Sequence, residues 1–130
     1  MKLLIKNTTI VTVNDQDQVL EHADLTVSGK NIVGVGKAPL DFIPDRVIDG
    51  KGKLVMPGLI NAQTHLSMTL MRNYADDLPF NDWLFKKIKP LEDHLLAEDV
   101  RLGAKLGIAE MIRGGTTCFH DMYFHMDEVA

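Results

Sequence analysis

Apolar and polar residues alternate along much of the first 56 positions, and this alternation predicts short β-strands. A period of two places every second side chain on the same face of a strand, which suits a sheet with one buried face. The runs with this pattern are Leu3 to Ile5, Thr9 to Val13, Leu25 to Val27, Ile32 to Val35, Arg46 to Ile48 and Lys53 to Met56. The segment Ser28 to Asn31 has the composition of a tight hairpin turn. We therefore expect a small antiparallel β unit before Pro57.

The apolar period lengthens in the second half of the chain, which indicates helices. From Leu96 to Arg113 the apolar residues recur at helical spacing, as a stripe of Val100, Ala104, Ile108, Met111 and Ile112. Gly114 and Gly115 follow this stripe, as expected of a left-handed helix C-cap.

A shorter helix is predicted from Asn81 to Lys89, because Asn is a good N-cap and Pro90 would end the helix. Residues near 58–64 and 116–122 have the apolar and β-branched character of strands. A strand, a long helical connection and a second strand follow one another in parallel sheets. We therefore expect an α/β arrangement over residues 57–130.

Composition and charge exclude several classes of partner. The net charge of −4 and the scattered basic residues provide no positive patch for nucleic acid or for an anionic membrane. No apolar run reaches the roughly 18 residues that a membrane helix needs. The single cysteine cannot form an internal disulfide, and the residues after Met1 lack a signal-peptide core, so we expect a cytoplasmic protein.

Gln63 and His65 are the first candidates for chemistry. At positions i and i+2 of a strand, their side chains point to the same face, at the carboxyl end where α/β folds place their sites. Two imidazoles at this spacing would chelate a metal ion, but here one of the pair is an amide. From the residues alone, a hydrogen-bonded structural histidine is the more common interpretation.

Other polar and aromatic residues have simple structural interpretations. Trp83 would be a core residue of the short helix, and Glu92 a solvated charge. His120 and Asp121 lie near the end of the second strand, where alternation points only one of them inward. Three further histidines have no partner spacing and are expected on the surface: His22, His94 and His125. We expect Cys118 to be a small core residue.

The segment from Leu54 to Ala130 resembles the amidohydrolase superfamily, and within it the methylthioadenosine/S-adenosylhomocysteine deaminases and the triazine chlorohydrolase group. The matching residues are Val55 to His65, Met68 to Arg72, Ala75 to Leu78, Trp83-Leu84, Pro90 to Glu92, Gly114 to Thr117 and Asp121 to Phe124. The matching segments occur in the same order as in the family and are spread along the whole of residues 54–130. The resemblance implies that residues 57–130 begin a (β/α)₈ TIM-type barrel with strands 1 and 2. Residues 1–56 look like part of the small antiparallel β-sandwich that flanks it.

The resemblance also implies roles for individual residues. His65 matches the second histidine of a His-x-His metal-binding pair, and Gln63 stands in place of the first. Glu92 matches a carboxylate that holds ribose hydroxyls, and Trp83 an aromatic residue near the base. His120 and Asp121 are further candidates at the barrel mouth. The later ligands and the acid/base residues of the family have no counterpart within the chain, so no catalytic residue is expected in it.

The resemblance implies zinc or another divalent metal in full-length relatives, which deaminate adenine nucleosides. An amide oxygen is a weaker zinc ligand than imidazole, so we expect weak metal binding and no activity from the 130 residues alone. Alternatives are an aminohydrolase or chlorohydrolase acting on guanine, cytosine or triazine rings, or a non-catalytic fragment or interaction module. Glu92 favours a ribosyl substrate. We also expect self-association, because the second strand has an open edge.

Overall fold

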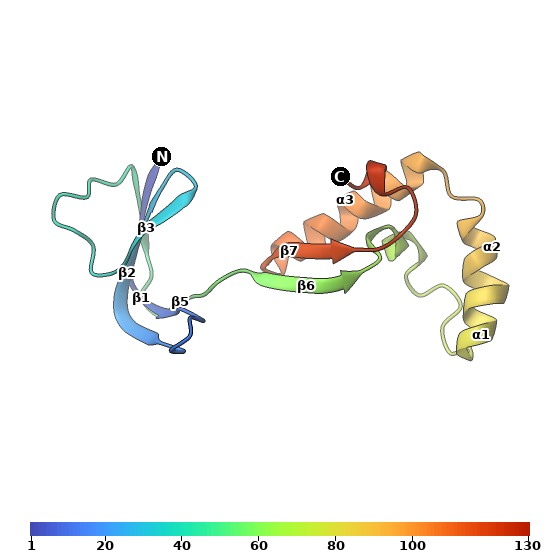
Figure 1. Cartoon of the computed structure of the whole chain (residues 1–130), viewed down its shortest axis with the longest axis horizontal. Helices are drawn as coiled ribbons and strands as arrows, with labels where there is room; N and C mark the ends of the chain where they lie inside the picture. Colours follow the sequence, from blue (N-terminus) through green and yellow to red (C-terminus); the bar gives the residue numbers. More distant parts are fainter. The chain divides into compact units, whose positions relative to one another are not determined.

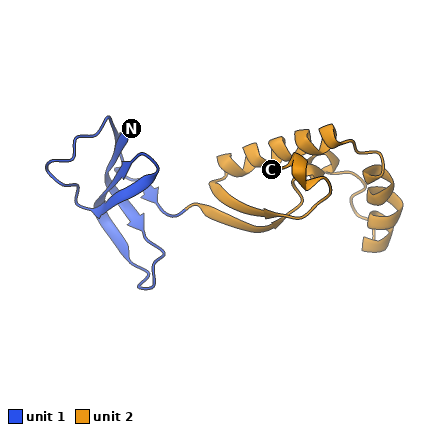
Figure 2. Cartoon of the chain, turned by 45° about the horizontal axis from the view of Figure 1, so that its top comes forward, with its two compact units in different colours: residues 1–57 blue, residues 58–130 orange.

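The computed structural model describes residues 1–130, which separate into two units, Met1–Pro57 and Gly58–Ala130 (Figure 2). The first unit contains only strands and turns, and the second combines two strands with several helical segments (Figure 1). The change from one unit to the other lies at Pro57, where the apolar period of the sequence also changes.

A five-stranded sheet forms the first unit. Its strands are β1 (Lys2–Val11), β2 (Val19–Ser28), β3 (Asn31–Gly36), β4 (Arg46–Asp49) and β5 (Leu54–Val55). They are ordered β3-β2-β1-β4, and β5 also pairs with β1. The predicted hairpin is confirmed, since Ser28 pairs with Asn31 and Gly29 has a φ of 63°, which glycine adopts without a steric penalty.

The prediction of an antiparallel sheet is correct for β1, β2 and β3 and wrong for β4 and β5, which both run parallel to β1. The reason lies in residues 37–45, which return the chain to the beginning of β1. There the N–H of Asp45 donates to the carbonyl of Lys2 (2.9 Å), and the Lys2 N–H donates to the Asp45 carboxylate (2.6 Å). Because β4 starts beside the start of β1, the sheet is mixed.

Three buried residues form the core of the first unit: Ile10, Ala23 and Leu25. The hydroxyl of Thr8, which is also buried, donates to the carbonyl of Lys53 at 2.7 Å and so fixes the approach to β5. The apolar alternation of β1 and β2 therefore supplies this core, as the sequence pattern indicates.

The predicted parallel strand pair is present in the second unit. It consists of β6 (Leu59–Thr64) and β7 (Thr116–Asp121), with Leu59 opposite Thr116 and Thr64 opposite Asp121. The long helix α3 (Ala97–Arg113) lies along one side of this pair (Figure 1). Gly114 is its C-cap residue, and Gly115, directly after the cap, has the left-handed φ of 86°.

Helix α3 buries or half-buries four of the five residues of the predicted stripe. Val100 and Ala104 are buried as expected, but Ile112 is 68% exposed. Two buried glycines, Gly103 and Gly107, complete the contact surface and allow the 3₁₀ segment η1 (Leu66–Met71) to approach the helix closely. The expectation for Cys118 is also wrong, because this side chain is exposed.

The predicted short helix continues through Pro90 instead of ending there. Helix α1 (Phe80–Trp83), the π-helical turn η2 (Leu84–Ile88) and α2 (Lys89–Glu92) follow one another without a break. A proline ring normally clashes with the carbonyl four residues earlier. The wider π turn immediately before α2 relaxes this constraint. The remaining helical segment is η3 (Met126–Glu128), and none of the helices has both the length and the apolarity that a membrane span requires.

Candidate functional site

The structure brings Gln63 and His65 together at the carboxyl end of β6. The strand ends at Thr64, and His65 occupies the N-cap position of η1. The side-chain nitrogen Nε2 of Gln63 lies 3.1 Å from Nε2 of His65. The spacing of two residues therefore gives the side-by-side arrangement that the sequence predicts, although His65 itself lies just beyond the strand.

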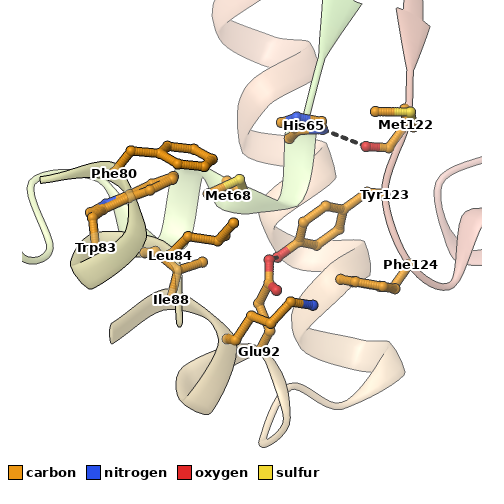
Figure 3. Close-up of a pocket in the computed structure, with 11 residues that line it drawn as sticks. His65, Met68, Phe80, Trp83, Leu84, Ile88, Glu92, Met122, Tyr123 and Phe124 are labelled. Atoms are coloured by element: carbon orange, nitrogen blue, oxygen red, sulfur yellow. Dashed lines mark hydrogen bonds between the residues drawn. The ribbon is translucent and has the colours of Figure 1, made fainter. Parts of the chain in front are cut away.

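A backbone carbonyl fixes the orientation of the His65 ring. Nδ1 of His65 is hydrogen-bonded to the carbonyl oxygen of Met122, directly after β7 (Figure 3). A carbonyl oxygen only accepts, so Nδ1 carries the proton and a neutral His65 has its lone pair on Nε2. Metal-binding histidines are commonly oriented in this way by a carbonyl on the far nitrogen.

Asp121 anchors the turn that carries His65. One oxygen of its carboxylate accepts from the N–H of Leu66 (3.1 Å) and from that of Met122 (3.0 Å). The other oxygen, Oδ2, is buried and has no hydrogen-bond partner. Of the two candidates at the end of β7, Asp121 is therefore the one that interacts with the β6 turn, whereas His120 is exposed and does not line the cavity beside His65.

An apolar cavity of about 470 Å³ opens beside His65 (Figure 3). Most of its lining is apolar or aromatic, namely Met68, Phe80, Trp83, Leu84, Ile88, Met122 and Phe124. The polar groups among its lining residues are His65, Lys89, Glu92 and Tyr123. A largely apolar cavity with a few polar groups is the usual form of a small-molecule site.

Glu92 and Tyr123 form a hydrogen-bonded pair in this cavity. The Tyr123 hydroxyl donates to Oε1 of Glu92 at 2.9 Å, and the Tyr123 ring lies between Glu92 and His65 (Figure 3). Burial raises the pKa of the Tyr123 phenol well above its usual value, and the hydrogen bond to Glu92 and the negative charges of Glu92 and Asp121 raise it further. Tyr123 is therefore a neutral hydrogen-bond donor that orients the Glu92 carboxylate.

Trp83 lies on the opposite side of the cavity from Tyr123. It is partly buried in α1, and its ring centroid is 6.1 Å from that of Phe80. These two rings, tilted by 37° to each other, form the aromatic wall on that side of the cavity (Figure 3). The other three histidines, His22, His94 and His125, are exposed, as expected.

Sequence reasoning missed several groups that build the site. Tyr123 and the carbonyl of Met122 lie directly after β7, at and just beyond the end of the strand predicted over residues 116–122. Their partners lie far away along the chain, Glu92 by 31 residues and His65 by 57. No local spacing signals contacts of this kind.

The donor set of the chain does not by itself fit a catalytic metal ion. No group of three or more His, Cys, Asp or Glu side chains is arranged to hold one. A catalytic zinc site normally has three protein ligands and one position for water. His65 offers one well-oriented nitrogen, and the adjacent Gln63 presents an amide N–H to that same nitrogen.

Comparison with known proteins identifies the family. Residues 54–130 match the Amidohydrolase family. The chain belongs to this family. A 5-methylthioadenosine/S-adenosylhomocysteine deaminase of Acetivibrio thermocellus is 53% identical over 133 residues, covering 100% of the chain and 31% of the relative. A protein of the same description from Thermoanaerobacter pseudethanolicus is 51% identical over 130 residues, covering 100% of the chain and 30% of the relative.

Solved structures of this amidohydrolase group have the same local fold. An adenosine deaminase from Xanthomonas campestris with bound zinc superposes with a TM-score of 0.93 at 42% identity, covering 98% of the chain and 30% of that structure. The atrazine chlorohydrolase of Arthrobacter aurescens, complexed with zinc, gives 0.87 at 28% identity, covering 98% and 32%. The predicted family resemblance is confirmed, and the chain corresponds to the N-terminal portion of an amidohydrolase, about 30% of the length of the curated relatives it matches.

Proposed function

We propose that the chain is the substrate-binding first portion of a metal-dependent amidohydrolase that deaminates a purine nucleoside. The observation that carries this proposal is the cavity with His65 at one end and the Glu92–Tyr123 pair beside it. The similarity to proteins described as methylthioadenosine/S-adenosylhomocysteine deaminases supports the choice of substrate.

The proposed architecture follows from the same relatives. Residues 57–130 would be the first two strands and connecting helices of a (β/α)₈ barrel, with the cavity at its carboxyl-terminal mouth. Residues 1–56 would contribute part of the β-sandwich beside it. The parallel pairing of β6 and β7 and the position of α3 along that pair support the barrel assignment.

The cavity residues suggest how a nucleoside would bind. Glu92, held by Tyr123, would accept hydrogen bonds from two ribose hydroxyls, and Trp83 and Phe80 would pack against the base. His65 would contribute one ligand to a divalent metal such as zinc, which the adenosine deaminase and atrazine chlorohydrolase structures contain. The remaining ligands and the acid/base groups would come from outside these 130 residues.

A ribosyl substrate accounts for the cavity better than a bare heterocycle does. The atrazine chlorohydrolase shows that the local fold also serves triazine chemistry. A carboxylate in a largely apolar cavity is costly unless a ligand or a neighbour satisfies it. Tyr123 bonds one oxygen of Glu92 and leaves the other available for a hydroxyl donor.

A chimera tests the proposal directly. Residues 1–130 would replace the matching 31% of the Acetivibrio thermocellus relative, and ammonia release from methylthioadenosine would be measured. Gln63→His should raise both zinc affinity and turnover, because imidazole is a stronger zinc ligand than an amide oxygen. A folded, zinc-loaded Gln63→His chimera without turnover would show that the chain does not belong to a nucleoside deaminase.

Glu92→Gln in the same chimera tests the ribose assignment. Loss of charge-assisted hydrogen bonds, worth about 1.5–3 kcal/mol, should raise KM for methylthioadenosine about 10- to 100-fold. Free adenine has no ribose and provides the matched control substrate, whose binding should change little. An equal effect on both compounds would contradict the role of Glu92 in holding ribose.

The isolated chain is proposed to be non-catalytic, which the lack of a three-ligand cluster favours. Dialysed protein should contain far less than one zinc per chain and should release no ammonia from methylthioadenosine. Elemental analysis and an ammonia assay provide the two measurements. Stoichiometric zinc together with turnover would contradict this proposal.

A further inference from the structure

Gln63 contacts the one nitrogen of His65 that a metal ion would need. The two Nε2 atoms are 3.1 Å apart. The amide nitrogen of Gln63 can only donate a hydrogen bond, so the imidazole nitrogen must accept. On the other side of the ring, the Met122 carbonyl can only accept, so Nδ1 must donate.

Both contacts select the same neutral tautomer of His65. With the proton on Nδ1, the lone pair on Nε2 faces the Gln63 amide N–H. If the amide were reversed, its oxygen would face that lone pair, and the contact would be repulsive. The Met122 carbonyl thus fixes the ring and, through the ring, the orientation of Gln63.

We infer that Gln63 acts as a hydrogen-bond cap on His65 Nε2, and that this cap competes with a metal ion for the nitrogen. This inference deepens the proposed function, on whose metal site it rests. The resemblance to the amidohydrolase superfamily implies a metal ligand at position 63. In this chain, Gln63 at that position does not act as a weak metal ligand. It occupies the nitrogen with which His65 would bind the metal.

Substitution of Gln63 distinguishes a cap from a weak ligand, because removing a cap should raise the affinity for Zn²⁺ and removing a ligand should lower it. Gln63→Leu keeps most of the side-chain size and removes both the amide donor and the amide oxygen. If Gln63 is a cap, the variant should bind Zn²⁺ about 2- to 10-fold more tightly, which is the contribution of one ordinary hydrogen bond. If Gln63 is a ligand, the variant should bind more weakly.

The experiment uses the 130-residue chain at neutral pH, with zinc chloride as the probe and the dissociation constant from isothermal titration calorimetry as the readout. In the variants that retain His65, its ring resonances show that the zinc binds there. Gln63→His is the positive control and should bind more tightly than either protein. A His65→Ala background is the negative control, in which Gln63→Leu should have no effect. Equal or weaker binding by Gln63→Leu, or the same increase without His65, would overturn the inference.

Nitrogen NMR of the metal-free chain provides a second test. In the neutral form of the His65 ring, the proton should be on Nδ1, and Nε2 should couple to a Gln63 amide proton. A neutral ring with its proton on Nε2 instead of Nδ1 would overturn the inference. Neither measurement requires turnover, so the cap can be established or rejected whether or not the chimera deaminates a nucleoside.

Discussion

At the residue scale, Tyr123 connects the two polar ends of the candidate site. Its ring centroid is 6.1 Å from that of His65, and its hydroxyl donates to Glu92. Burial is the main cause of its raised pKa, followed by the hydrogen bond and charge of Glu92 and the charge of Asp121. A phenolate at this position would be poorly solvated and would be repelled by two carboxylates, so the neutral donor is the stable form.

The raised pKa of Tyr123 predicts a dependence of stability on alkaline pH. The folded state holds the phenolic proton more tightly than the unfolded state, whose pKa is about 10. The resulting stabilisation is complete below pH ~10 and is lost as the pH rises towards the folded-state pKa. Urea unfolding should therefore show a smaller alkaline loss of stability in Tyr123→Phe than in the unsubstituted chain. Identical pH dependence in the two proteins would contradict the raised pKa.

Local spacing accounts for the site residues that the sequence reveals. Gln63 and His65 are two positions apart, so strand geometry alone places them together. Tyr123 is different, because its partner Glu92 lies on another element and 31 residues away. Likewise, only the fold shows that the Met122 carbonyl selects the His65 tautomer. The pattern thus predicts which ligand-type residues meet, but not the groups that orient them.

At the element scale, the contact of η1 with α3 positions His65. The Ser67 hydroxyl donates to the carbonyl of Val100 at 2.9 Å, and the Thr69 hydroxyl to that of Gly103 at 2.8 Å. This close approach depends on α3 residues without a Cβ. Because His65 directly precedes η1, the packing of these two elements sets the position of its ring.

Gly103→Ala should destabilise the second unit. A Cβ at this position would lie 2.6 Å from the Ser67 carbonyl oxygen, which is backbone and cannot move aside easily. We expect a loss of about 1–3 kcal/mol from overpacking, partly offset by the ~1 kcal/mol that alanine gains in a helix. Chemical denaturation provides the measurement.

Gly114→Ala is the matched control for this substitution. It adds the same methyl group at the end of the same helix, where φ is −85° and the nearest carbonyl oxygens would be 3.5 Å away. This variant should change the free energy of unfolding by less than about 1 kcal/mol. Equal losses in both variants would show that the close packing at Gly103 is not the cause.

The elements that the sequence predicts correctly are those with local determinants. The β2–β3 hairpin depends on Gly29, and the end of α3 on Gly115, both in the left-handed region. The parallel pairing of β4 with β1 has no such signal, because it depends on where residues 37–45 return the chain. The continuation of the helix through Pro90 depends on a π turn that propensity does not reveal.

At the scale of the whole molecule, the sequence predicts the buried residues of the first unit better than those of the second. The boundary at Pro57 follows from the change of apolar period, and the core of the first unit from its alternation. In the second unit, apolar residues of β6 and β7 remain exposed, among them Leu59 (50%) and Ile60 (73%). The alternation of apolar residues predicts a strand, but it does not reveal whether another part of the protein buries the apolar side chains of that strand.

The exposed strand pair predicts self-association. β6 and β7 pair only with each other, so each has an open edge beside exposed apolar side chains, including Ile60 and Phe119. Open edges and contiguous apolar surface favour pairing between copies of a chain. Sedimentation velocity should show a mass that increases with concentration, and Ile60→Lys should reduce the increase by adding charge at the edge.

Leu40→Lys is the matched control. It adds the same charge at a fully exposed residue of the first unit and should leave association unchanged. A compact monomer at every concentration, or equal effects of the two lysines, would show that this edge does not drive association.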